Sequence, residues 1–60
     1  MTIYHVRLLD LETGETVDER DVVCEVWKEA LALAKAEFVA ETGAAVDGLA
    51  AEVLFDYEEG

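Results

Sequence analysis

The chain has 60 residues, 53% of them hydrophobic, and its 15 carboxylates against four lysines and arginines give a formal net charge of −11. This length allows one small domain, residues 1–60, with a thin core, and the apolar content is high enough for folding. The charge excludes direct binding to nucleic acid and to anionic membranes, because the electrostatic part of either affinity would be repulsive.

Other simple features narrow the class of protein further. The one cysteine, Cys24, excludes an internal disulfide. No apolar run reaches the ~18 residues of a membrane span, and the N-terminus lacks the charged-then-apolar layout of a signal peptide. We therefore expect a soluble, cytoplasmic protein.

The first half of the chain indicates a β-hairpin. Residues 2–11, TIYHVRLLDL, are rich in β-branched and aromatic residues and carry apolar side chains on both faces, which is typical of a central strand. Residues 12–15, Glu-Thr-Gly-Glu, are typical of a tight turn. Residues 16–23 are mostly polar, as expected of an edge strand that must not pair with another chain. Val17 joins the apolar face of this strand only if a bulge shifts it.

The stretch from Cys24 to Gly43 predicts a helix. Its Ala, Leu, Glu and Lys content favours helix formation, and Gly43 can close the helix in the left-handed conformation. Apolar side chains recur at helical spacing on one stripe: Trp27, Ala30, Leu31, Ala34 and Phe38. We expect Trp27 and Phe38 to anchor the core, so that replacing either with Ala would cost about 3–5 kcal/mol.

The last part of the chain predicts a loop at residues 44–48 and a strand at residues 49–57, whose residues alternate regularly. Phe55 and Tyr57 would lie on the face toward the helix, with Glu52 and Asp56 on the other face. These elements predict an α+β fold: β-β-α-β, with a three-stranded antiparallel sheet in the order 2-1-3 and one helix packed on one face. The expected core is Tyr4, Val6, Leu8, Val22, Cys24, Trp27, Ala30, Leu31, Ala34, Phe38, Val53 and Phe55.

The sequence offers no pattern for catalysis or metal binding. There is no Ser, Cys24 is expected to be buried, and the only imidazole, His5, is expected on the uncovered face of the sheet. No calcium-loop spacing and no glycine-rich phosphate loop is present. We expect no enzymatic activity, no metal and no cofactor.

The charge pattern is the remaining functional signal. On the uncovered face of the sheet we expect acidic side chains from both outer strands, with His5 and Arg7 between them. Residues two apart on a strand are about 6.8 Å apart, comparable to two phosphate steps along one DNA strand. Such rows are typical of a protein that mimics DNA toward a basic partner. The candidate partner-binding residues are Glu19, Asp21, Glu52, Asp56, Asp18, Glu12 and Glu15.

The whole chain resembles a known group of proteins. Its length, its acidity, its order of hairpin, helix and closing strand, and the stretch MTIYHVRLLDLETGETVDERDVV are similar to small phage-encoded anti-CRISPR proteins, particularly acidic inhibitors of type I systems. The resemblance rests on no motif and transfers no residue role. It implies a protein that binds a type I CRISPR–Cas surveillance complex in the cytoplasm of the host cell and blocks its binding to target DNA, as a DNA mimic.

Two other interpretations stay open. The acidity is also typical of a protein from a high-salt organism, with no special partner. The chain also fits an interaction module, antitoxin-like or homodimeric, without nucleic-acid mimicry, although we expect a monomer rather than a homodimer. The helix face opposite the core is more apolar than a solvated face requires: Ala32, Leu33, Ala36, Val39 and Ala40.

Overall fold

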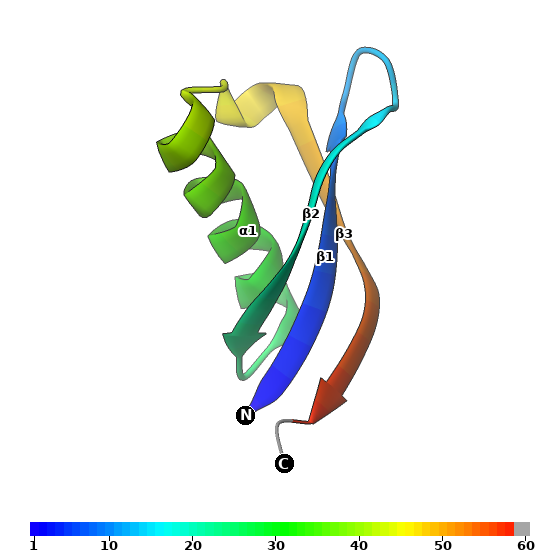
Figure 1. Ribbon diagram of the computed structural model, residues 1–60, viewed down its shortest axis with the longest axis vertical. Helices are drawn as coiled ribbons and strands as arrows, with labels where there is room; N and C mark the ends of the chain where they lie inside the picture. The colour runs from blue at the N-terminus through cyan, green and yellow to red at the C-terminus, as the bar shows by residue number, and fades with distance from the viewer. Residues whose placement is uncertain (59–60) are drawn as a thin grey trace.

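The computed structural model of the protein describes residues 1–58 and confirms the predicted β-β-α-β fold (Figure 1). Three antiparallel strands form one sheet in the order β2-β1-β3, and one helix covers one face of it. No helix within residues 1–58 is long and apolar enough to cross a membrane. The elements are β1 (Thr2–Asp10), β2 (Thr16–Cys24), α1 (Trp27–Thr42), the short 3-10 helix η1 (Val46–Gly48) and β3 (Leu49–Glu58).

The β1–β2 turn forms where the sequence predicted it. Asp10 closes the turn with its side chain, because Asp10 Oδ1 accepts the N–H groups of Glu12 (2.7 Å) and Thr13 (3.3 Å). Gly14 has φ 74°, a conformation that favours glycine. The pairing of β1 with β2 skips Val17, since Leu8 lies opposite Asp18 and Leu9 opposite Thr16. A bulge is therefore present at Val17, which is itself 41% exposed.

Helix α1 begins at Trp27, three residues later than predicted, and Cys24 belongs to β2. No side chain caps the first turn at Val26, so the sequence carried no local start signal. The end is as predicted: Gly43 has φ 76°, and its N–H donates to Val39 O at 2.8 Å.

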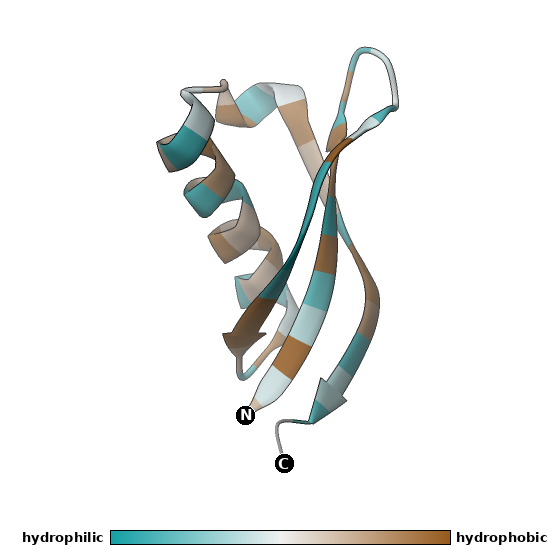
Figure 2. Ribbon diagram, viewed as in Figure 1, coloured by the Kyte–Doolittle hydropathy of each residue, from teal (hydrophilic) through white to brown (hydrophobic). Residues whose placement is uncertain are grey.

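The core lies between α1 and the covered face of the sheet. Val6 and Leu8 are fully buried at its centre, and Figure 2 shows hydrophobic and hydrophilic residues alternating along β1. The helix contributes two buried alanines, whose small side chains allow α1 to lie close to the sheet. The buried cluster is Tyr4, Val6, Leu8, Val22, Cys24, Ala30 and Ala34, with Leu31, Phe38, Ala51 and Val53 packed against it and partly buried.

The core prediction is wrong for two residues, Trp27 and Phe55. Trp27 is 53% exposed, because the first residue of α1 lies at the end of the helix–sheet contact and its large ring is only half covered. Phe55 is 54% exposed, because a second bulge interrupts the pairing of β1 with β3: Val6 lies opposite Val53, but His5 lies opposite Phe55. Leu54 is the extra residue, and every side chain after it changes face.

Candidate interaction face

The face of the sheet away from α1 is uncovered, and we call it the open face. The pairing of the strands determines its members, because directly opposite residues share a face. Two polar residues of β1, His5 and Arg7, lie in its centre. It comprises Ile3, His5 and Arg7 from β1, Glu19, Asp21 and Val23 from β2, and Glu52, Phe55 and Tyr57 from β3.

His5 binds two carboxylates of β2 at once. Its Nδ1 lies 2.7 Å from Asp21 Oδ1, and its Nε2 lies 2.8 Å from Glu19 Oε1. A neutral imidazole has only one N–H, whereas an imidazolium donates from both nitrogens. The hydrogen bonds to Asp21 and Glu19 therefore raise the pKa of His5. The same hydrogen bond from His5 lowers the pKa of Asp21.

Two aromatic rings of β3 extend this cluster. The Phe55 ring stacks on the His5 imidazole, with ring centroids 4.7 Å apart and an angle of 13° between the ring planes. The Tyr57 ring lies beside Phe55, with their centroids 6.3 Å apart. The Tyr57 hydroxyl donates to Asp21 Oδ2 at 3.2 Å. The pKa of Tyr57 is raised, mainly because the hydroxyl is partly buried and to a smaller extent because of the negative charge of Asp21. Phe55 and Tyr57 remain 54% and 45% exposed, so they form an aromatic patch on the surface.

Arg7 neutralises the acidic residue of β3 on this face. It lies between the two outer strands, opposite Glu19 on β2 and Glu52 on β3. Its Nη2 donates to Glu52 Oε1, while its buried Nε has no hydrogen-bond partner among the described residues. Glu52 is therefore an ion-pair partner of the sheet itself and not a free carboxylate.

The predicted rows of bare carboxylates are absent from residues 1–58. Glu19, Asp21 and Glu52 lie on the open face as expected, but each is paired with His5 or Arg7. Asp56 was predicted on this face and lies on the other one, opposite Tyr4, because the bulge at Leu54 reverses it.

Asp18 also lies on the helix side, in a network around Arg20. The Arg20 guanidinium binds Asp18 Oδ2 at 2.7 Å, Glu41 Oε1 at 2.9 Å and Glu37 Oε1 at 3.2 Å. It also lies 5.9 Å from the centroid of the Phe38 ring. These contacts tie β2 to α1 and lower the pKa of Glu41, so Asp18 serves the fold. Sequence analysis did not predict this network, because Glu37 and Glu41 are far from Arg20 in the chain.

Three carboxylates without an ion-pair partner among the described residues lie at the hairpin end of the molecule. Glu12 and Glu15 lie in the β1–β2 turn, and a hydrogen bond from Leu11 N–H to Gly48 O (3.0 Å) holds η1, with Asp47, beside that turn. Among the described residues these three carboxylates form no ion pair. Helix α1 also ends here (Figure 1), with no basic residue in its last turn, so its dipole adds negative potential. We call Glu12, Glu15 and Asp47 the acidic end.

Comparisons of the chain with protein-family models, with curated proteins and with solved structures found no match. Within residues 1–58 no group of three or more His, Cys, Asp or Glu side chains is placed to hold a metal ion. Exposed aromatic rings beside carboxylates suit a cationic side chain, which is attracted by both. Phe55 and Tyr57 were not among the predicted site residues, because nothing in the regular alternation of β3 marks the bulge.

Proposed function

We propose that the protein binds a basic, nucleic-acid-handling protein and competes with nucleic acid for it. The observation that carries this proposal is the density of charge. Residues 1–58 carry 14 carboxylates against four lysines and arginines, a net charge of −10, along a longest dimension of 36 Å, or about one net charge per 3.6 Å, close to the one charge per ~3.4 Å of a single DNA strand. A surface that binds nucleic acid would therefore attract this protein with a comparable field.

The two surfaces described above have different parts in this binding. The acidic end carries free carboxylates, which steer a basic partner and speed association. The open face carries the aromatic patch of Phe55 and Tyr57, and aromatic residues are enriched among those that dominate interface energies. Glu19 and Asp21 are each about half exposed beside it and remain accessible to a cation of the partner.

The first partner to test is a type I CRISPR–Cas surveillance complex, because the chain resembles phage inhibitors of these systems in length, charge and order of elements. A purified complex is loaded with labelled target DNA, and displacement of the DNA is measured as the protein is added. We expect displacement that weakens as salt is raised. Absence of displacement at low salt would refute this partner.

The role of the acidic end is tested with two matched triple variants. One carries Glu12→Lys, Glu15→Lys and Asp47→Lys. The control carries three charge reversals elsewhere, and both change the net charge by the same amount. We expect the first to slow association and weaken binding by about tenfold more than the control. The control residues are Glu25, Glu29 and Asp56, all exposed.

The role of the aromatic patch is tested with Phe55→Ala and Tyr57→Ala. Each should weaken binding by about thirtyfold, mainly through faster dissociation, if these rings are interface anchors. Leu54→Ala is the matched control, because it removes an exposed apolar side chain from the same strand. Binding that is insensitive to salt, to the acidic-end variant and to both aromatic variants would contradict the proposal.

A further inference from the structure

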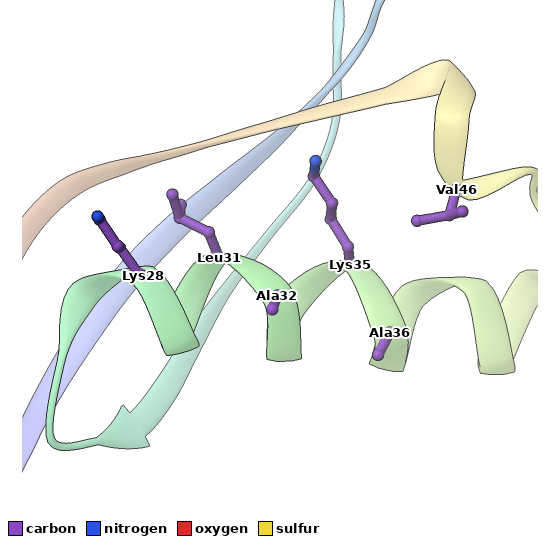
Figure 3. Close-up of a pocket in the computed structure, with 6 residues that line it drawn as sticks. All are labelled: Lys28, Leu31, Ala32, Lys35, Ala36 and Val46. Carbon is purple, nitrogen blue, oxygen red and sulfur yellow. The ribbon is translucent and has the colours of Figure 1, made fainter.

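A groove lies between α1 and η1, and none of its lining residues belongs to the acidic end or to the open face. Figure 3 shows Lys28, Leu31 and Lys35 projecting from one side of α1, with Val46 of η1 facing them. The groove has a volume of about 460 Å³ and is open to solvent, because most of its lining residues are exposed. Its lining residues are Lys28, Leu31, Ala32, Lys35, Ala36 and Val46.

The charged side chains that line the groove are both basic, whereas the chain as a whole is acidic. Both lysines of the chain line it, at positions i and i+7 of α1, or about 10.5 Å apart along the helix axis. Both arginines are paired with carboxylates, but neither lysine forms an ion pair among the described residues. Within residues 1–58, this is where an anion would meet two ammonium groups beside apolar side chains.

We propose that this groove binds a linear amphiphile with a carboxylate head, the chemistry of a fatty acid anion. Its carboxylate would lie on Lys35, which is less exposed than Lys28 and so less screened, and its chain would run from there along Leu31. The side chains of the lining residues offer hydrogen-bond donors and no acceptors. A carboxylate brings only acceptors and therefore matches this lining.

The test is a calorimetric titration of the full chain with decanoate, below the concentration at which it forms micelles. We expect saturable binding of one decanoate per protein chain. Decanol, which has the same alkyl chain without the charge, should bind about fivefold more weakly. Acetate should not bind in the same concentration range. Lys35→Gln should remove the preference for decanoate over decanol. Equal affinities of the parent protein for decanoate and decanol, or no binding of decanoate, would overturn the proposal.

Two matched variants test whether decanoate binds in this groove. Ala36→Glu adds a carboxylate to the wall of the groove, and Ala40→Glu adds one to an exposed position of the same helix outside it. Both make the same change in net charge, and a melting curve of each shows whether the fold is kept. We expect Ala36→Glu to weaken decanoate binding by about tenfold and Ala40→Glu by less than about twofold. Equal effects of the two would overturn the assignment to this groove.

Discussion

At the scale of single residues, His5 holds the open face together. It contacts Asp21 and Glu19 of β2 through its nitrogens and Phe55 of β3 through its ring, so one side chain connects all three strands. The charged form of His5 makes both hydrogen bonds, which is why its pKa is raised. The packing of this face therefore depends on pH.

We expect the stability of the domain to depend on His5 protonation. A raised folded-state pKa means that the contribution of His5 is fully present below the unfolded value of about 6.5 and is lost as pH rises through the folded value. The lowered pKa of Asp21 gives the lower limit, since its contribution is lost as pH falls through its folded value. The difference in unfolding free energy between the parent and His5→Gln should thus be largest between about pH 4 and 6.5.

The measurement is urea unfolding of both proteins over this pH range, with an NMR titration of the only imidazole in the chain. The titration midpoint of His5 should lie above 6.5 in the parent, and Asp21→Asn should move it down, because Asp21 is the largest cause of the shift. A midpoint at or below the ordinary value would show that the two hydrogen bonds do not persist in solution.

Leu8 and Trp27 should contribute differently to the stability of the domain, because they are buried to different extents. Leu8 is fully buried, so Leu8→Ala should cost about 2–5 kcal/mol. Trp27 was expected to be an anchor but is half exposed, so Trp27→Ala should cost about 1 kcal/mol, half of what full burial of a large apolar side chain contributes. Chemical unfolding of both variants compares them directly. A larger loss for Trp27→Ala would mean that the ring packs against the sheet after all.

At the scale of elements, β3 shows most clearly what the sequence predicts and what it does not. Its existence, direction and place beside β1 follow from apolar alternation and from chain connectivity. The bulge at Leu54 does not, because Ala51, Val53, Phe55 and Tyr57 alternate without interruption through it. Pairing with β1 decides the register, and that is a property of two strands together.

The other elements follow the same division. Gly14 and Gly43 are local signals, and they mark the turn and the helix end correctly. Arg20 looked like one more charge on an edge strand, but it closes over Phe38 and binds carboxylates of α1. Its role depends on how the helix packs against the sheet, and no local sequence pattern predicts that packing.

Deletion of Leu54 tests the bulge. In the structure Leu54 is the extra residue, so its removal should leave Phe55 opposite His5 and restore a regular ladder. We expect the variant to melt within about 4–8 °C of the parent, the shift that ~1 kcal/mol gives a domain of this size. The stacking of Phe55 on His5 should persist in NMR spectra. If β3 paired regularly instead, the deletion would turn Phe55 and Tyr57 out of the core and cost several times more.

At the scale of the whole molecule, a thin core works against strong self-repulsion. Within residues 1–58 only eight hydrophobic residues are buried, the seven of the core cluster and Leu49, while the net charge of the chain is −11. The ion pairs of Arg7 and Arg20 and the hydrogen bonds of His5 relieve part of the repulsion where strands and helix meet. Carboxylates outside these pairs, at the acidic end and at exposed positions such as Glu25, Glu29 and Asp56, oppose the compact state and favour binding to cations. Either high salt, as in a halophilic organism, or binding to a basic partner would compensate for this negative charge.

Salt dependence of folding distinguishes these two. A halophilic protein needs molar salt to fold, whereas a protein whose charge serves a basic partner must fold in ordinary cytoplasm. Screening is already strong at ~0.1 M salt, where the Debye length is about 10 Å, and the internal ion pairs lie inside that length. We therefore expect a cooperative thermal transition, followed by circular dichroism, at ~0.1 M salt, with only a modest rise in midpoint toward 1 M. The acidic-end triple variant should melt higher than the parent at low salt and converge with it at high salt, because it removes repulsion that screening removes as well. A parent chain that is unfolded at ~0.1 M salt and folds only near 1 M would favour the halophilic interpretation and leave the charge without need of a partner.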